Sequence, residues 1–265
     1  MTSSPRPAYL VPPIARWLGR QRIDLAECES TNDEAARLAR AGARHGTVVI
    51  ADRQRSGRGR NGRTWDSPSS LGLYLSAVIR PPLPLVDVPP MTLAIGIGVC
   101  DAVRAAGAPG MLKWPNDVLV AGKKISGVLV EAQSQGSRVE AVIVGIGVNV
   151  AGSSADLSPD LAHRAITLEQ AAEAPIDREA FIATLLASVE RWIDRYVAMG
   201  IETIIPAWHE RMVPGLSAQA QVDGTTLTGQ LAGLDLDGAL LLRDQTGALH
   251  RVRSGDVELA PLQAI

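Results

Sequence analysis

Lysine is almost absent from this chain. Only three of its 26 basic residues are lysine, and all the others are arginine. A genome whose codon usage favours arginine explains the scarcity, but such a bias would replace lysine wherever any positive charge suffices. The three that remain, Lys113, Lys123 and Lys124, lie within twelve positions of one another. Because an ammonium is a compact point charge and a guanidinium is a planar fork, these lysines are candidates for a task that arginine cannot perform.

Cysteine, histidine and long apolar runs are also scarce. Cys28 and Cys100 form no CxxC pair, and the four histidines are scattered, which argues against a disulfide framework and a zinc site. The first twenty residues contain four prolines and no apolar run of signal-peptide length. No stretch approaches the ~20 apolar residues that cross a bilayer. We therefore expect a cytoplasmic protein with no membrane partner.

A strong net charge is missing too. The 265 residues carry a formal net charge of −2, so no overall field attracts the chain to nucleic acid or to anionic lipid. The composition is 46% hydrophobic and 20% charged, as in a globular protein that buries a core. Basic residues therefore matter only where they cluster.

Hydrophobic periodicity predicts two domains. Residues 1–213 mix strands and helices without regular βαβ alternation, which indicates an α+β domain with a mixed sheet. Residues 214–265 show short strands separated by turns, which indicates a small all-β barrel. The expected strands of the first domain are 22–29, 47–53, 71–80, 111–120, 125–133 and 138–150. Its expected helices are 30–43, 91–107, 177–199 and 201–212, the first with a Thr31–Glu34 capping box and a stop at Gly42.

The stretch "SGRGRNGRTW", residues 56–65, is the first that carries chemistry. Its glycines let the backbone approach a ligand closely, and its arginines can grip a carboxylate or phosphate at two points. Trp65 offers a flat face for a base. A solvated surface loop and an RGG-like nucleic-acid segment are the alternatives. A single copy inside a folded, nearly neutral domain favours an enzyme loop.

The stretch "KWPNDVLVAGKKISG", residues 113–127, is the second. Pro115 predicts a turn that presents Asn116 and Asp117 at a strand end, where they can bind a nucleotide and Mg²⁺. A hairpin would bring Lys124 back beside Asp117. The alternative is an ordinary hairpin with a solvated lysine turn, which the clustering of all three lysines disfavours.

Two weaker signals complete the set. "ESTN", residues 29–32, lies at a strand-to-helix junction, where Ser30 and Thr31 can simply be helix caps. "GIGVN", residues 145–149, has two glycines of a dinucleotide fingerprint, but Val150 replaces the third, so a Rossmann site is not expected.

In this order, the segments resemble the biotin–protein ligase family. "STN", "GRGRNGRTW", "KWPND", "KKISGVLVE" and "GIGVN" match its signatures at near-family spacing, and the resemblance extends from about residue 22 to the end. It implies a catalytic domain like that of class II aminoacyl-tRNA synthetases and an SH3-like C-terminal domain. Some members carry an N-terminal DNA-binding domain and repress transcription. Only about twenty residues precede the first expected strand, so we expect no specific DNA binding and no repressor activity.

The resemblance also implies site residues. It places biotin against Ser30, Thr31, Asn32, Gln54, Gly57, Arg58, Gly59, Arg60, Lys124 and Gly127. It places ATP against Arg60, Asn61, Arg63, Trp65, Asn116, Asp117, Lys124 and Asn149. Within these sets Gln54 would bind the ureido ring, Trp65 would flank the adenine and Asp117 would support Mg²⁺. The catalytic residues would be Lys124, Arg60 and Asp117, whereas Asn61 stands where some members have arginine.

The implied reaction has two steps. Biotin and MgATP would give biotinyl-5′-AMP, and a lysine of a biotin carboxyl carrier domain, of the acetyl-CoA carboxylase type, would then receive the biotin. Two alternatives remain open at this stage: a lipoate or octanoate ligase of related fold, and a nucleic-acid-binding module built on the arginine loop. Homodimerisation is also possible.

Overall fold

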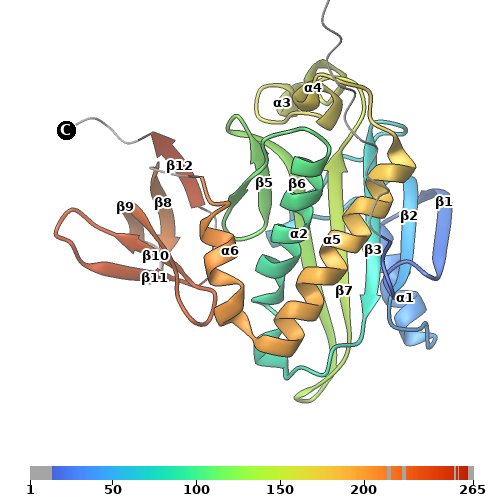
Figure 1. Cartoon of the computed structure of the whole chain (residues 1–265), viewed down its shortest axis with the longest axis horizontal. Coiled ribbons are helices and arrows are strands. Elements are labelled where there is room, and N and C mark those ends of the chain that lie inside the picture. The colour runs from blue at the N-terminus through green and yellow to red at the C-terminus, as the bar shows by residue number, and fades with distance from the viewer. Residues whose placement is uncertain (1–13, 214–215, 223–224, 254, 256, 262–265) are drawn as a thin grey trace, which may run out of the picture.

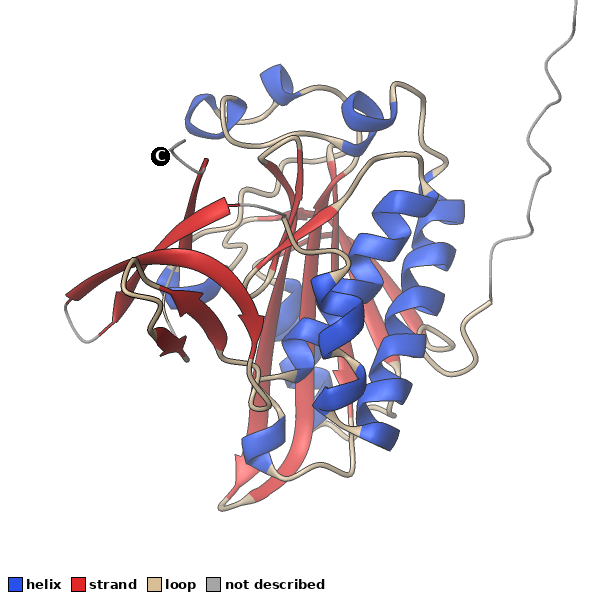
Figure 2. Ribbon diagram, turned by 60° about the vertical axis from the view of Figure 1, so that its left-hand side comes forward, coloured by secondary structure: helices blue, strands red, loops and turns tan. Residues whose placement is uncertain are grey.

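Two β-sheets organise the chain, a larger one covered by helices and a smaller one beside it (Figures 1 and 2). The computed structural model describes residues 14–213, 216–222, 225–253, 255 and 257–261. The strands of the seven-stranded sheet are β1 (Arg22–Cys28), β2 (Thr47–Gln54), β3 (Gly72–Ile79), β4 (Met111–Lys113), β5 (Asp117–Val120), β6 (Lys123–Gln135) and β7 (Arg138–Asn149). Their order is β1-β2-β3-β7-β6-β5-β4, and only β1 and β2 pair in parallel.

The helices are α1 (Thr31–Arg40), α2 (Met91–Ala105), α3 (Pro159–Ala162), α4 (Leu168–Ala172), α5 (Arg178–Met199) and α6 (Ile205–His209). The smaller sheet consists of β8 (Leu216–Val222), β9 (Thr225–Leu234), β10 (Leu240–Arg243), β11 (Leu249–Val252) and β12 (Val257–Pro261), in the order β11-β10-β9-β8-β12. The expected α+β class, with a mixed sheet backed by helices and an all-β C-terminal part, is confirmed.

The larger sheet has two different faces, because successive side chains of a strand point to opposite sides. Leu75 and Val144 face a continuous apolar core that includes α2 and α5, which lie across the sheet in Figure 1. On the opposite face Ala35 of α1 forms a smaller cluster with Val78 and Ile143. Ser76 of β3 and Gly145 of β7, each two positions from Val78 and Ile143, pair with each other and continue this second face. The second face is therefore polar or glycine beyond the small cluster.

Two local predictions were wrong. The Thr31–Glu34 capping box does not form, because the Thr31 hydroxyl donates to Gln54 and Glu34 binds Arg37 instead. The helix expected over 201–212 is a 3₁₀ turn followed by the five-residue α6. Pro206 lies in the first turn of α6, where its missing N–H is tolerated but would break a longer helix.

The segment Leu85–Ala105 has the length and mean hydropathy, 1.4, of a membrane-spanning helix. The expectation that no stretch approaches that length was wrong on this measure. About 67% of the most apolar window is buried within the protein, where α2 packs between the sheet and α5. Burial in the core explains its composition, so hydropathy carries no argument for a membrane here.

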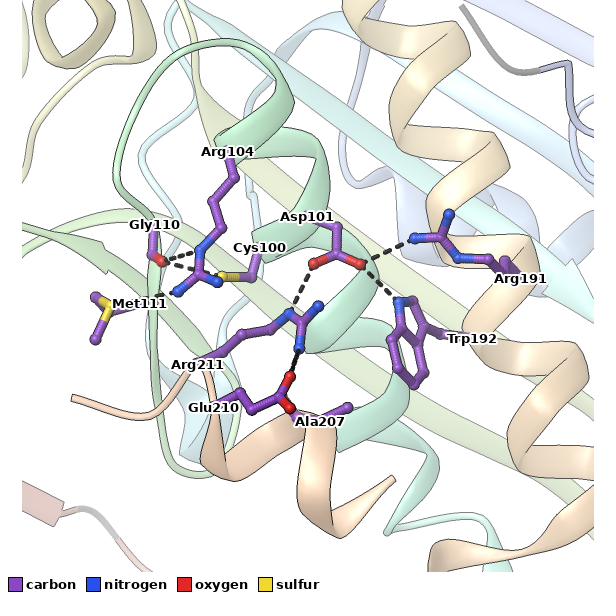
Figure 3. A network of polar contacts seen from close by, with 10 residues as sticks. All are labelled: Cys100, Asp101, Arg104, Gly110, Met111, Arg191, Trp192, Ala207, Glu210 and Arg211. Atoms are coloured by element: carbon purple, nitrogen blue, oxygen red, sulfur yellow. Dashed lines mark hydrogen bonds and ion pairs between the residues drawn. The ribbon is translucent and has the colours of Figure 1, made fainter. Parts of the chain in front are cut away.

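Asp101 of α2 connects three helical segments (Figure 3). Its Oδ2 accepts hydrogen bonds from Arg191 and from the indole N–H of Trp192 on α5, each at 2.9 Å. Its Oδ1 accepts one at 2.7 Å from Arg211, directly after α6. The Arg211 guanidinium also lies 5.6 Å from the Trp192 ring. This partly buried cluster fixes the chain where it leaves the helical layer.

From Arg211 the chain runs beside β4. The Leu112 N–H donates to the Arg211 carbonyl at 2.6 Å, and the Val213 N–H donates to the Leu112 carbonyl at 3.3 Å. Directly after β4, the indole N–H of Trp114 donates at 3.0 Å to the carbonyl of Gly238, in the turn between β9 and β10. The β4–β5 connection therefore holds the second sheet against the first.

Candidate active site

A cleft of about 890 Å³ lies on the glycine-rich face of the larger sheet. β12 contributes Val257, Glu258 and Leu259 to its wall, so both sheets take part. Most of the predicted site residues line this cleft: Ser30, Thr31, Asn32, Gln54, Arg58, Gly59, Arg60, Arg63, Trp65, Asn116, Asp117, Lys124, Gly127 and Asn149. Segments that are far apart in the sequence thus meet at one place.

Two predicted residues do not line the cleft. Gly57, at the start of the loop, is closely packed on the side away from the cleft. A Cβ atom there would come 2.6 Å from the Ser67 hydroxyl and 3.0 Å from the Gln54 amide. Asn61 has a left-handed backbone, with φ of 56°, and faces a neighbouring hollow of about 350 Å³. Gly57 therefore acts through close packing, and Asn61 belongs to the outer side of the loop.

Glycines form the floor of the cleft. Gly127 of β6 pairs with Gly147 of β7, and the indole of Trp65 lies against both. A Cβ atom at position 147 would come 2.7 Å from the indole Nε1, and one at position 127 would come 3.0 Å from Cζ3. The absence of side chains at these two positions gives the indole its place on the sheet.

Lys124 stands beside this floor. Its Nζ is 2.7 Å from Oδ1 of Asp117, as the hairpin spacing predicted, and 5.2 Å from the centroid of the Trp65 ring. The Asp117 side chain is 17% exposed and that of Lys124 36%, so the ion pair is only partly screened by water. The cleft therefore holds one oriented cation whose ammonium is in reach of a bound anion.

Two asparagines support the neighbouring backbone. Asn116 donates through Nδ2 to the Val128 carbonyl at 2.9 Å, while its Oδ1 accepts from Arg60 at 3.2 Å. Asn149 donates to the carbonyls of Lys124 and Ile166, at 3.4 and 3.3 Å. Both amides therefore hold the strand that carries the lysine, and Arg60 joins the loop to the turn before β5.

Polar side chains from the start of α1 and from β2 form the inner end of the cleft. The backbone N–H and the hydroxyl of Thr31 both donate to Oε1 of Gln54, at 2.7 and 3.0 Å. The Gln54 amide donates in turn to the Ser67 hydroxyl at 2.8 Å. Ser30, Thr31 and Asn32 are each at most 4% exposed. This buried end is suited to a small ligand with several hydrogen-bonding groups.

Tyr74 lines the cleft from β3. Burial, assisted by the negative charge of Asp66, raises the pKa of its phenol above the ordinary range. Its hydroxyl donates to the Pro68 carbonyl at 2.9 Å. Tyr74 is therefore a neutral wall of the cleft at physiological pH.

Three arginines of the loop region are bound to carboxylates. Arg53 lies 3.2 Å and Arg55 2.5 Å from Glu27. Arg58 lies 2.9 Å from Asp33 and 2.7 Å from Glu131. These pairs neutralise much of the positive charge that the sequence displays, which disfavours the nucleic-acid interpretation of the loop.

Several residues at or directly behind the cleft are absent from the predicted site. Gly145 and Gly147 line the cleft, and Ser67, Ser76 and Glu131 support predicted site residues through hydrogen bonds. The signal for the glycines was present: "GIG" in a strand places both glycines on one face, where a strand otherwise carries side chains. Ser76 gave no such signal, because one small polar residue in an apolar strand is common.

Two family profiles match the chain. That of the "Biotin/lipoate A/B protein ligase family" matches residues 26–149, and that of the "Biotin protein ligase C terminal domain" matches residues 219–260. The first covers the strands and loops that build the cleft, and the second covers most of the smaller sheet. The fold and the cleft are therefore those of the biotin and lipoate class of protein ligases.

Individual relatives narrow this class. The chain is 36% identical over 244 residues to the "Bifunctional ligase/repressor BirA" of Bacillus spizizenii, covering 91% of this chain and 75% of that protein. It is 33% identical over 228 residues to the "Biotin--[acetyl-CoA-carboxylase] ligase" of Paracoccus denitrificans, covering 84% and 94%. The structure of the Aquifex aeolicus biotin protein ligase in complex with biotin and ATP superimposes with a TM-score of 0.78 at 29% identity, covering 91% and 99%. The chain belongs to the biotin protein ligase family.

Proposed function

We propose that this chain activates biotin with MgATP and transfers it to a lysine of a carrier domain of the acetyl-CoA carboxylase type. The observation that carries the proposal is the position of Lys124, whose ammonium lies between Asp117 and the Trp65 ring in the cleft. The Aquifex relative was solved with biotin and ATP bound, and the Paracoccus relative is named for acetyl-CoA carboxylase.

Biotin would occupy the inner end of the cleft. Its ureido ring would meet Thr31 and Gln54, and its carboxylate would extend toward Lys124. Gly127 would lie beneath the chain of methylene groups, and the Trp65 indole, which lies against Gly127 and Gly147, would flank the adenine and bound the biotin site on that side. Burial of the ring among fixed polar groups provides selectivity, because a ligand without the ureido group would leave those groups unpaired.

ATP would lie at the outer end, beside the turn that contains Asn116. In the first step a carboxylate oxygen of biotin bonds to the α-phosphorus, and the bond from that phosphorus to the bridging oxygen of pyrophosphate breaks. Lys124 and Arg60 would stabilise the negative charge that accumulates on the oxygens around phosphorus. Their role is chiefly to hold two anions together, which unassisted would repel each other.

In the second step the amine of the carrier lysine attacks the carbonyl carbon of biotinyl-5′-AMP. The bond between that carbon and the phosphate oxygen breaks, AMP leaves, and the amine loses a proton to give an amide. Residues 57–65, called the arginine loop below, would cover the adenylate until the carrier arrives. Exclusion of water would protect the mixed anhydride from hydrolysis.

Mg²⁺ would enter with the nucleotide as part of the substrate. Among the residues that the structure describes, no group of three or more His, Cys, Asp or Glu side chains could hold a metal ion. In nucleotide sites Mg²⁺ commonly binds one or two carboxylates together with phosphates and water. Asp117, a carboxylate of the cleft next to Asn116, fits this requirement.

We also propose that the boundary between the two domains lies after residue 213. Residues 214 and 215 lie outside the described part of the chain.

The test is incubation of the protein with biotin, MgATP and an apo carrier domain, followed by mass spectrometry of the carrier. We expect a gain of one biotinyl group that depends on ATP. Replacement of biotin by lipoate or octanoate is the control for the related ligases. A gain with lipoate and none with biotin would overturn the proposed substrate.

A further inference from the structure

A carboxylate outside the predicted site joins the arginine loop to α1. Oε2 of Glu131, on β6, accepts a hydrogen bond from Arg58 of the loop at 2.7 Å and another from the amide nitrogen of Asn32 at 2.7 Å. The same Asn32 side chain accepts, through Oδ1, a hydrogen bond from the Ser76 hydroxyl at 2.6 Å. One side of the loop is therefore connected through Glu131 and Asn32 to Ser76, which is buried in β3 beneath the inner end of the cleft.

The other side of the loop is connected to the same serine. The Ser76 hydroxyl lies 2.8 Å from the hydroxyl of Thr31, which lies 3.0 Å from Oε1 of Gln54. The Gln54 amide donates to Ser67, whose hydroxyl donates to the backbone carbonyl of Trp65 at 3.0 Å. The two flanks of the arginine loop thus end in one hydrogen-bonded chain that passes through the head-group pocket.

Glu131 fixes the orientation of the Asn32 amide and of the Ser76 hydroxyl. An ionised carboxylate only accepts, so the Asn32 amide must turn its NH₂ group toward Glu131 and its oxygen toward Ser76. Ser76 has a single proton, and it donates that proton to Asn32. The Thr31 hydroxyl also has a single proton, so it donates either to Ser76 or to Oε1 of Gln54, and the hydrogen bond from the Thr31 N–H to Gln54 holds in both cases. The carboxylate therefore fixes the hydrogen-bond directions as far as Ser76.

Close packing makes the chain rigid. Ser76 is fully buried, and Thr31 and Asn32 are each 4% exposed. A Cβ atom at Gly145, which pairs with Ser76 across the strands, would come 2.9 Å from Cγ of Asn32. The Asn32 amide therefore packs directly against the backbone of Gly145, and this packing opposes rotation of the amide group.

We propose that Ser76 and Glu131 are positioning residues that orient the biotin head-group pocket and hold the arginine loop against it. The proposal rests on the proposed function for the identity of the ligand. In it Ser76 keeps Thr31 and Asn32 aligned for the ureido ring. Glu131 transmits that alignment to Arg58, and a loosened end at either residue disorders both the pocket and the loop.

The test measures three quantities on each variant: the Kd of biotin by calorimetry, the KM of ATP, and the rate of tryptic cleavage within the loop of the ligand-free protein. Loss of one buried hydrogen-bonding partner in S76A should raise the Kd of biotin about 10- to 100-fold. Cleavage of the loop should accelerate, and the KM of ATP should rise less than the Kd of biotin, because Ser76 and Glu131 contact residues of the biotin set. E131A should show the same pattern.

Two further variants separate positioning from a general loss of charge. Asp33 also binds Arg58, but Glu131 still holds that arginine in D33A, so this variant should leave both loop cleavage and the Kd of biotin within about twofold. In E131Q the amide oxygen can still accept from Asn32. This variant should therefore recover most of the biotin affinity that E131A loses.

The outcomes are distinct. Biotin binding by S76A and E131A within about twofold of the wild type would overturn the proposal alone. Equal loop cleavage in E131A and the wild type would also overturn it. A wild type that binds no biotin would overturn the proposed function together with it. If S76A does not fold, the Glu131 variants decide the question, because the Glu131 side chain is 36% exposed and tolerates substitution.

Discussion

Gly147 and Trp65 are in direct contact on the floor of the cleft, with the indole lying over the bare backbone of β7. A methyl group at position 147 would come 2.8 Å from Cζ2 of the indole, which is closer than packed carbon atoms approach. The indole can occupy this place only because position 147 carries no side chain. The shape of the cleft therefore depends on a residue that contributes no chemical group to it.

The first prediction concerns this contact. G147A should displace the indole and raise the KM of biotin about tenfold, as expected for overpacking that costs ~1.4 kcal/mol. Steady-state adenylation kinetics measure the effect. G96A is the matched control, because Gly96 lies in α2 and its methyl group would lie 3.6 Å from Leu112 of β4, an ordinary contact. Unchanged biotin kinetics in G147A would show that the indole does not bound the biotin site.

The second prediction concerns Lys124. In K124R the planar guanidinium replaces the point charge beside Asp117, and biotinyl-AMP formation should fall about 10²- to 10³-fold. Release of pyrophosphate in a single turnover measures this step without the carrier. K123R is the control, because the adjacent side chain points to the other side of β6. A wild-type rate in K124R would remove Lys124 from the chemistry.

The third prediction uses Glu190 of α5, which is 3% exposed. Burial alone would raise the pKa of this carboxyl, but hydrogen bonds from the backbone N–H groups of Leu18, Trp17 and Arg16 outweigh it and hold the pKa below its usual value. A lowered pKa means that Glu190 stabilises the fold above its unfolded-state pKa, and that this contribution is lost as the pH falls through the folded-state value.

Urea denaturation at pH 7, 5, 4 and 3 tests this sign. The free energy of unfolding of the wild type should decrease toward low pH more steeply than that of E190Q, which lacks the titrating group. At pH 7 E190Q should be less stable by about 1–3 kcal/mol. The exposed Glu140, changed to glutamine, is the control. Parallel pH profiles for wild type and E190Q would contradict the prediction.

The fourth prediction concerns the two thiols. Burial raises the pKa of Cys100 to about 11, and burial together with the carboxylate of Glu34 raises that of Cys28 to about 11. Since the thiolate is the reactive form, both should react slowly with Ellman's reagent at pH 8. Cys100, fully buried with its Sγ 3.2 Å from the Gly110 carbonyl, should react only after unfolding. Rapid labelling of Cys100 in the native protein would contradict this.

The sequence predicted the fold where periodicity was strong. The buried helix α2, the hairpin that joins Asp117 to Lys124 and the small β-sheet were all recognisable, because each depends on local pattern and turn residues. The capping box failed because Gln54, 23 positions away, binds the Thr31 backbone and hydroxyl. A local rule cannot anticipate a partner that only the tertiary fold supplies.

The site was predicted less completely than the fold. Motifs identified the residues with charged or amide groups, but Ser76 lies in an ordinary apolar strand, and Glu131 ends the motif "KKISGVLVE" without a role assigned to it. Their importance arises from register: Ser76 stands opposite Gly145, and Glu131 reaches both Asn32 and Arg58. Such relationships depend on which strands become neighbours, and that information is not contained in any single stretch of sequence.

The segment that leaves α6 has a further consequence for the integrity of the protein. By pairing with Leu112, the backbone after Arg211 covers the outer edge of β4, which would otherwise present unpaired N–H and C=O groups. An uncovered sheet edge is a template for pairing with another chain. Removing the chain from Arg211 onward would expose that edge, so a truncated catalytic part should self-associate and not remain a monodisperse enzyme.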